Sequence, residues 1–236
     1  MSEHQKNFKR PSKKFQPRGL AILFEDHDIL VVDKRSGLLT VSTEKVRENT
    51  AHYLLNEYVR RGNSKSRNRV FIVHRLDRDT SGIIVFAKNE NAKRYLQDEW
   101  QGFKKIYAAV VNGTLPEKEG VITSYLAENR AQKMYSVDDP KKGKLARTGY
   151  KVLRQSKKYS LLEIDLLTGK KNQIRVHCAD KGCPVVGDKK YGGNKNSMKR
   201  LALHAVSISL VHPYTKEKMT FTTKMPDYFT SLVHTQ

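Results

Sequence analysis

Short apolar runs alternate with polar turns along most of the chain. Two runs rich in β-branched residues, LAILFED and DILVVDK, begin at Leu20 and Asp28 and predict a pair of strands. Segment 49–61 instead repeats its apolar residues at helical spacing behind the candidate caps Asn49 and Thr50. The same patterns predict further helices near 90–100 and 172–181, and further strands near 70–74, 83–87, 105–112, 119–126, 132–137, 146–154, 159–167, 200–211 and 217–223. Because many strands follow one another without an intervening helix, we expect an α+β fold with a central mixed, largely antiparallel sheet and flanking helices.

Two segments are rich in basic residues and poor in apolar ones. Residues 1–19 carry six basic side chains and one acid, with almost no aliphatic residue. They predict a disordered basic arm, which either wraps a phosphate backbone or serves as a solubilising tail. Segment 60–69, RRGNSKSRNR, has five basic groups and no acid, and it predicts a loop that is either a solvated linker or a phosphate contact. Residues 20–236 are expected to form one domain.

The net charge of the chain indicates the kind of partner. Lys and Arg number 45 against 24 Asp and Glu, a formal charge of +21, which exceeds what solubility requires and favours a polyanion. No apolar run approaches the roughly 20 residues of a membrane-spanning helix, and the amino end has no apolar signal core. We therefore expect a cytoplasmic protein that binds nucleic acid and no membrane.

The sequence offers little support for a metal or an organic cofactor. The two cysteines, Cys178 and Cys183, are too few for a structural zinc site or a disulfide scaffold. The chain has no Walker A loop and no GxGxxG motif, so neither ATP nor a dinucleotide is indicated. We expect an activity that requires no cofactor.

The densest polar stretch is HRLDRDTSG, residues 74–82, which directly precedes the apolar run 83–87. Asp77 and Asp79 lie two residues apart and could share a divalent metal, as in a nuclease, although no third ligand is suitably spaced nearby. A surface turn with local ion pairs is a second interpretation. A single catalytic carboxylate is the third, and residue types alone leave all three open.

The stretch resembles the central motif of the RluA family of pseudouridine synthases, HRLDxxTSG followed by an apolar strand. Five further segments resemble the same family in the same order: DHDILVVDKRSGLL at 26–39, KKIYAAVVNG at 104–113, LLTGKKNQIRVH at 166–177, GDKKYGG at 187–193 and LALHAVSISLVHP at 201–213. The resemblance covers nearly the whole chain beyond the basic arm. It implies the pseudouridine synthase catalytic fold, with a catalytic cleft, over residues 20–236.

The resemblance also implies the chemistry. The reaction breaks the bond from ribose to the base nitrogen, turns the base and rejoins it through carbon 5. A carboxylate attacks the base or the ribose, or assists loss of a ribose proton, and the sequence leaves this choice open. By resemblance this carboxylate is Asp77, and Arg175 is expected to pair with it and hold it ionised against burial. Tyr107 matches the family tyrosine whose ring packs against the uracil.

Further residues of the same motifs are expected to bind the RNA. By resemblance Arg75 enters the space that the flipped uridine leaves. His74 is expected chiefly to fix the turn, with an RNA contact as the alternative. Thr80 is expected to bond the backbone of the loop that presents Asp77.

The sequence departs from the family pattern at two places. Lys170 and Lys171 stand where the family usually has an arginine and a histidine before QIR; they keep positive charge but cannot grip phosphate in the bidentate manner of arginine. DKRSG replaces the commoner Lys-Pro-Ala-Gly, which removes the rigidity of the proline. Neither departure changes Asp77, Tyr107 or Arg175.

The expected protein is a monomeric RNA pseudouridine synthase that isomerises a specific uridine in structured ribosomal or transfer RNA. The alternative is a non-catalytic RNA-binding or ribosome-assembly protein with the same fold. The net positive charge alone suggests this alternative. That alternative would not require Asp77, Tyr107 and Arg175 to occur together.

Overall fold

The computed structural model describes residues 8–193 and 198–234, and the chain divides into two compact units. Unit 1 comprises Met1–Phe103 and Ser207–Thr223, and unit 2 comprises Lys104–Val206 and Lys224–Gln236. The single domain expected over 20–236 stays a prediction. None of the helices in the described part of the chain is long and apolar enough to cross a membrane.

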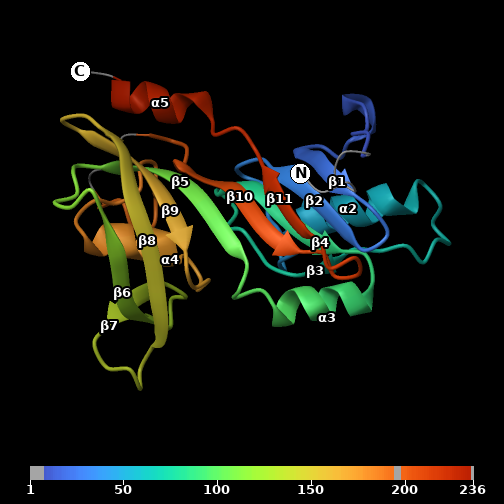
Figure 1. Ribbon diagram of the computed structural model, residues 1–236, viewed down its shortest axis with the longest axis horizontal. Helices are drawn as coiled ribbons and strands as arrows, with labels where there is room; N and C mark the ends of the chain where they lie inside the picture. Colours follow the sequence, from blue (N-terminus) through green and yellow to red (C-terminus); the bar gives the residue numbers. More distant parts are fainter. Residues whose placement is uncertain (1–7, 194–197, 235–236) are drawn as a thin grey trace. The chain divides into compact units, whose positions relative to one another are not determined.

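Unit 1 is built on an antiparallel sheet (Figure 1). Strand β2 pairs with β1 on one side and β4 on the other, β3 pairs with β4, and β11 pairs with β10. Every residue of β4 is buried, which explains its continuous apolar run. The elements of this unit are η1 (Lys13–Phe15), β1 (Leu20–Glu25), β2 (Ile29–Lys34), α2 (Ala51–Arg60), β3 (Phe71–Ile72), β4 (Ser81–Ala87), α3 (Glu90–Asp98), β11 (Lys218–Thr222) and the end of β10 (Leu203–Val211).

The two helices of unit 1 begin at capping side chains. Thr50 accepts a hydrogen bond from the Tyr53 backbone N–H (3.2 Å), and Asn89 accepts one from Ala92 (2.8 Å), so each cap satisfies a backbone donor of the first turn. Helix α3 packs against β3 and β4, and its Leu96 joins the core of the unit. These contacts fix both ends of the segment that contains the HRLDRDTSG stretch.

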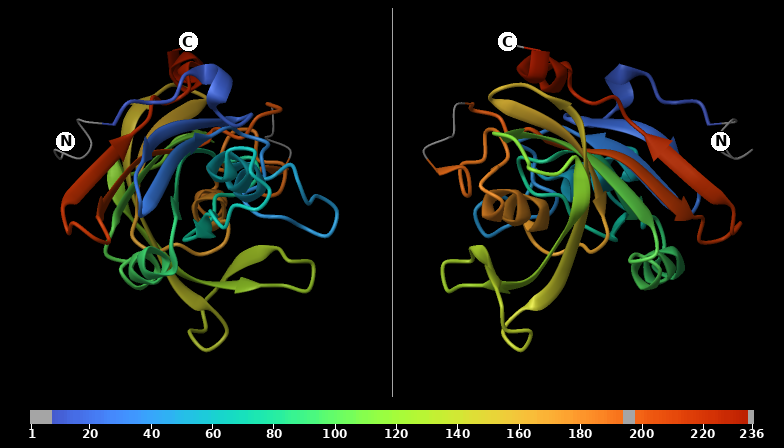
Figure 2. Two further views of the ribbon diagram at one scale, coloured as in Figure 1. Left: turned by 90° about the vertical axis from the view of Figure 1, so that its right-hand side faces the viewer. Right: turned by 60° about the vertical axis from the view of Figure 1, so that its left-hand side comes forward.

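Unit 2 contains antiparallel strands in the order β5-β9-β8-β6-β7 (Figure 2). Helix α5 packs on β5 and β9 through Phe229, and helix α4 packs on β6, β7 and β8 through Val176. The elements are β5 (Lys104–Asn112), β6 (Glu119–Glu128), β7 (Met134–Val137), β8 (Lys144–Gln155), β9 (Tyr159–Leu166), α4 (Gln173–Asp180), the start of β10 and α5 (Asp227–His234).

The predicted α+β class is confirmed, and most predicted elements end within a few residues of the observed ones. The predicted strand 70–74 is wrong in length, because only Phe71 and Ile72 pair with β4. Helix α5 was not predicted. It follows Pro226 and buries Phe229 and Val233, four residues apart, which is too short an apolar repeat to stand out in the sequence.

The predicted disordered arm is in part folded. Its first seven residues lie outside the described residues. From residue 8 onward the arm contacts unit 1: the Phe8 ring lies 5.4 Å from that of Phe24, centroid to centroid. The Gln16 amide donates to the Pro11 carbonyl (2.7 Å) and accepts from the Ile22 N–H of β1 (3.0 Å). The aromatic ring of Phe8 and the amide of Gln16 thus anchor the arm. The prediction missed this because it relied on the scarcity of aliphatic residues.

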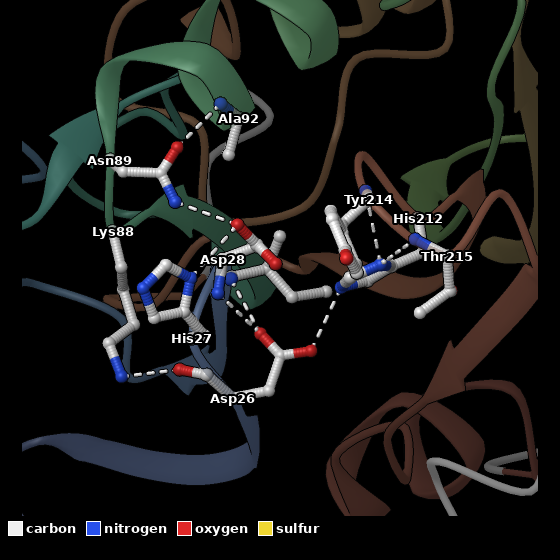
Figure 3. A network of polar contacts seen from close by, with 10 residues as sticks. Asp26, His27, Asp28, Lys88, Asn89, Ala92, His212, Tyr214 and Thr215 are labelled. Carbon is white, nitrogen blue, oxygen red and sulfur yellow. Dashed lines mark hydrogen bonds and ion pairs between the residues drawn. The ribbon is translucent and has the colours of Figure 1, made fainter.

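A polar network joins the β1–β2 turn to the β10–β11 turn of unit 1 (Figure 3). Asp26 accepts hydrogen bonds from the N–H groups of Asp28 and Ile29, both at 2.8 Å. Its other oxygen lies 2.8 Å from Nε2 of His212, which is buried. Burial raises the Asp26 pKa, but these hydrogen bonds and the His212 charge lower it, and the net pKa lies below the usual value.

We expect Asp26→Ala to lower the free energy of unfolding by about 3 kcal/mol, because it leaves the buried His212 ring and two backbone donors without their acceptor. Urea denaturation measures the loss. The matched control is His27→Ala in the same turn, whose side chain is almost fully exposed and which should change stability by less than about 0.5 kcal/mol. Equal effects of the two variants would show that the network contributes nothing beyond the turn itself.

Candidate active site

Asp77 lies in an irregular segment of unit 1 between β3 and β4. Its side chain is half-buried, whereas its neighbours Arg75, Arg78 and Asp79 are exposed and Leu76 is buried. The backbone turns directly after it, since the Thr80 N–H donates to the Asp77 carbonyl (3.2 Å). The loop therefore presents one carboxylate between a buried anchor and a charged surface.

The carbonyl groups of this loop are held by one segment, residues 34–40. Ser36 Oγ donates to the Asp79 carbonyl (2.7 Å), and the Gly37 N–H donates to the Arg78 carbonyl (2.9 Å). The buried Thr40 hydroxyl donates to the Leu76 carbonyl (2.8 Å). The segment DKRSGLLT thus donates hydrogen bonds to backbone carbonyls on both sides of Asp77. These bonds fix the backbone that carries the carboxylate.

Lys34 is the most deeply buried cation of the same segment, with no exposed surface. Its ammonium donates to the carbonyls of Leu38 (2.8 Å) and Arg78 (3.2 Å). Burial lowers the pKa of Lys34 to about 8, and the charges of Asp79, Asp77 and Asp33 oppose this shift. Lys34 therefore stays protonated at neutral pH and places a positive charge close to the Asp77 loop, within the same unit.

His74 has contacts that account for it as a structural residue. Its Nε2 accepts a hydrogen bond from the Val85 N–H of β4 (3.0 Å), and its ring stacks on Trp100 at 4.1 Å between centroids. A role of His74 toward RNA stays a prediction. Arg75 is exposed, as a residue that enters RNA would be, and Thr80 is buried beside the turn.

Arg175 lies on α4 of unit 2, where it forms a bidentate pair with Asp188. Nε donates to Oδ2 (2.7 Å) and Nη2 donates to Oδ1 (2.8 Å). The Asp188 side chain has no exposed surface, and that of Arg175 is 11% exposed. Burial raises the Asp188 pKa, whereas the hydrogen bonds and charge of Arg175 lower it, and the net pKa lies below the usual value. The sequence analysis did not predict this pair.

Further contacts fix the orientation of the pair. Asp188 Oδ1 also accepts from the N–H groups of Lys190 (2.8 Å) and Tyr191 (3.0 Å). The Arg175 guanidinium carbon lies 5.2 Å from the centre of the Tyr191 ring. Gly187, with φ of +77°, precedes Asp188 at a point where a Cβ atom would lie 2.0 Å from the Arg200 carbonyl oxygen, so only glycine fits.

Tyr107 lies on β5, opposite Ile164 of β9, and is 9% exposed. Ala108 and Val110 of the same strand pack under α5, so the alternation of the strand directs Tyr107 to the other face of the sheet. Lys105 shares that face and is buried; burial lowers its pKa, opposed by Asp165. A buried cation next to the expected stacking ring is a feature that the sequence analysis missed.

Lys170 and Lys171 precede α4. Lys171 is exposed and forms an ion pair with Glu128 of β6. The Lys170 N–H donates to Gln173 Oε1 (3.0 Å), and the buried Gln173 amide donates to Thr148 Oγ1 (2.9 Å). Gln173 therefore fixes the start of the helix that carries Arg175.

His177, two residues after Arg175, is fully buried and lies 2.8 Å from Thr148 Oγ1 and 3.0 Å from Ser124 Oγ. Burial lowers the pKa of His177 to about 4, so it is neutral at physiological pH. These contacts tie α4 to β6 and β8 through an uncharged ring.

One group of side chains in the described part of the chain has the residue types of a metal site, namely Asp26, Asp28 and His212. His212 Nδ1 accepts from the N–H groups of Tyr214 (3.3 Å) and Thr215 (3.0 Å), so Nε2 is the nitrogen that donates to Asp26 (Figure 3). Asp28 accepts from the Asn89 amide (2.7 Å), so all three side chains already form hydrogen bonds within the protein.

The predicted site residues divide between the units. Unit 1 carries His74, Arg75, Asp77 and Thr80 on one loop, and unit 2 carries Tyr107 on β5 and Lys170, Lys171 and Arg175 around α4. The predicted pairing of Asp77 with Arg175 stays a prediction. The partners that sequence reasoning missed, Lys34 and Asp188, both lie in segments quoted for the resemblance, but their residue types gave no sign of a buried charge.

Solved structures of two other proteins share this α+β fold. The solved structure of human RNA pseudouridylate synthase domain containing 4 has the same fold, with a TM-score of 0.74 and 23% sequence identity over 90% of this chain and 91% of that chain. Human RNA pseudouridylate synthase domain containing 1 matches with a TM-score of 0.69 and 25% identity, over 92% and 86%.

A family model described as RNA pseudouridylate synthase matches residues 28–180, and the chain belongs to this family. An uncharacterized RNA pseudouridine synthase of Bacillus subtilis, YhcT, is 39% identical over 203 residues, which are 84% of this chain and 66% of the relative. Ribosomal large subunit pseudouridine synthase D of Blochmanniella floridana is 32% identical, over 91% of this chain and 72% of the relative. The match to YhcT thus spans just under two thirds of that relative's length.

We expect Asp188→Asn to lower the free energy of unfolding by about 3–5 kcal/mol, because the amide leaves the largely buried Arg175 charge without its carboxylate. The matched control is Glu128→Gln, which breaks the more exposed pair with Lys171 and should cost less than about 1 kcal/mol. Urea denaturation of both variants measures the difference. A loss of under 1 kcal/mol for Asp188→Asn would contradict the assignment of a buried pair.

We expect the stability of the chain to fall as the pH drops from 6.5 to 4 and His177→Gln to remove part of that dependence. The unfolded histidine binds a proton near its ordinary pKa of 6.5, whereas the folded one resists protonation until about 4. Acid therefore favours the unfolded state across this window, by up to about 3 kcal/mol for this group. Chemical denaturation at several pH values measures the slope, and identical slopes for both proteins would refute the shift.

Proposed function

We propose that this chain isomerises uridine to pseudouridine in RNA. Membership of the RNA pseudouridylate synthase family is the observation that carries the proposal. The fixed backbone around Asp77 supports it, because a nucleophile must be held in position before the substrate arrives. The net charge of +21 supports an RNA substrate.

We assign the chemistry to Asp77. Its carboxylate acts as nucleophile or assists loss of a ribose proton, and Arg175 pairs with it so that it stays ionised. Since the Nε and Nη2 groups of Arg175 donate to Asp188, the guanidinium would meet Asp77 or the substrate through Nη1 or the outer N–H of Nη2. Asp188 is thus a positioning residue for Arg175.

The other residues receive roles in binding the flipped nucleotide. Tyr107 stacks on the uracil, which offsets part of the few kcal/mol that flipping costs. Arg75 enters the space that the base leaves, while Thr80 and His74 support the Asp77 loop. Lys170 and Lys171 contact phosphates; the ion pair of Lys171 with Glu128 would then open or share its charge when RNA binds.

We propose a specific uridine in structured ribosomal or transfer RNA as the target. The Blochmanniella floridana relative is a ribosomal large subunit pseudouridine synthase, which favours ribosomal RNA for this chain. The protein acts as a cytoplasmic monomer, and neither a metal nor an organic cofactor takes part in the isomerisation, which involves no net redox change.

We expect Asp77→Asn to abolish pseudouridine formation while RNA binding changes less than about threefold, because the amide keeps the shape of the side chain but not its nucleophilicity. Total RNA from a strain that lacks the protein is incubated with wild type or variant, and pseudouridine is mapped at nucleotide resolution. Asp98→Asn is the matched control in the same unit, and it should keep activity since Asp98 is exposed and lies on α3, outside the loop.

Three outcomes would count against the proposal. If wild type adds no pseudouridine at any salt concentration, the chain is a binding protein on an enzyme fold. Shortened RNA that depends on divalent metal would indicate a nuclease. Full activity of Asp77→Asn would remove Asp77 from the chemistry.

A further inference from the structure

A groove on unit 1 runs between the folded part of the arm and helix α2, with a volume of about 660 Å³. Pro11, Pro17 and Leu54 give it apolar walls, and Phe15 lines it from the arm. Lys14 and Arg61 line it with positive charge. The family motifs of the chain lie elsewhere in the sequence, so the proposed isomerisation assigns this groove no role.

The folded part of the arm forms one wall of the groove, and its own contacts hold it in place. The Gln16 amide ties the Pro11 carbonyl to the Ile22 N–H of β1, and Phe8 packs against the core residue Phe24. Between these anchors, residues Lys13–Phe15 form a single 3-10 turn. Two anchors on either side of one turn fix the position of the Phe15 side chain.

Phe15 is 65% exposed, although the turn could have buried an apolar ring against α2. The Lys14 ammonium lies 4.9 Å from the centre of this ring. An exposed aromatic face with a cation beside it is the combination that proteins use to stack a nucleobase and contact its phosphate.

The charges around the groove are positive and uncompensated. Glu57 is the acid that lines the groove, and Arg60 already pairs with it at 3.1 Å. Lys14 and Arg61 have no carboxylate within ion-pair distance among the residues that the structure describes. The arm and the basic loop 60–69 add further exposed lysines and arginines. Such a concentration of like charge is unfavourable until an anion binds.

We infer that this groove binds an unpaired stretch of RNA, with one base stacked on Phe15 and the adjacent phosphates held by Lys14 and Arg61. The inference rests on the proposed function in that RNA is the substrate, and it adds an anchoring site for RNA outside the isomerisation chemistry. The positive rim disfavours an apolar peptide, which would bring no negative charge to Lys14 and Arg61. It also disfavours a second copy of this chain, whose net charge is +21.

The test uses the full chain and a fluorescent ten-nucleotide oligoadenylate, which has no uridine and cannot be isomerised. Phe15→Ala should weaken binding roughly 5- to 150-fold, the range expected from loss of one stacked base, and Phe15→Trp should restore it. Lys14→Ala should reduce the slope of log K against log salt concentration by about 0.7, the value for one phosphate contact on a single strand. Anisotropy titrations at three salt concentrations give both quantities.

The matched control is Tyr214→Ala, which removes a ring of unit 1 that is 80% exposed and lies outside the groove. It should leave the affinity unchanged, and thermal unfolding verifies that all variants fold. Equal affinity of Phe15→Ala and wild type would overturn the inference and leave attraction by charge alone. Concentration-dependent dimerisation that Phe15→Ala abolishes would overturn it in favour of a second copy.

Failure of this inference is distinguishable from failure of the proposed function. Asp77→Asn should bind the oligoadenylate as wild type does. If wild type forms no pseudouridine but Phe15→Ala weakens oligoadenylate binding, the proposed isomerase activity is refuted and the RNA-binding groove is supported. If wild type forms pseudouridine but Phe15→Ala binds oligoadenylate equally well, the groove is refuted and the isomerase activity is supported.

Discussion

The ammonium group of Lys34 has no exposed surface, yet the loop that carries Asp77 depends on its remaining charged. A neutral amine would donate fewer hydrogen bonds to the carbonyls of Leu38 and Arg78, and it would leave the nearby carboxylates without compensation. Burial and the acidic neighbours act in opposite directions on its pKa, and their balance keeps the group protonated at neutral pH. The hydrogen bonds from the Lys34 ammonium therefore weaken if either its burial or the charge of its acidic neighbours is changed.

The buried Arg175–Asp188 pair changes how the electrostatics at Asp77 should be understood. The sequence suggested that Arg175 would be a single cation available for Asp77. In the structure Arg175 is already paired with the fully buried Asp188, so its net field at a third group is much smaller than that of an isolated arginine. Its contribution would then be directional, through the N–H groups that do not donate to Asp188, with the guanidinium oriented by Asp188 and Tyr191. Lys34, on the same unit as Asp77, supplies a second buried positive charge.

The parts of the fold that the sequence revealed are those with a strong local signal. Strand β4 follows from seven consecutive residues that are all buried, and α2 follows from its cap at Thr50 and its apolar spacing. The extent of β3 could not be predicted, because pairing with β4, and not the apolar run 70–74, decides where the strand ends.

The same distinction holds for the candidate site. The carboxylate loop was found through its motif, since nine adjacent residues carry it. Lys34 and Asp188 escaped because their roles arise from burial and from partners distant in sequence, such as Arg78 for Lys34. A lysine after an apolar strand and an aspartate after a glycine are ordinary surface patterns until tertiary packing removes them from water.

The distribution of charge in unit 1 suggests that affinity and catalysis depend on different residues. The Lys34 charge near Asp77 is buried, so it contributes a fixed field that salt screens weakly. Cations on the arm and on loop 60–69 are exposed, so their contribution to RNA binding falls steeply as salt increases. Raising the salt concentration should therefore increase the RNA concentration needed for half-maximal rate, while the rate at saturation, which depends on the preorganised loop, changes little.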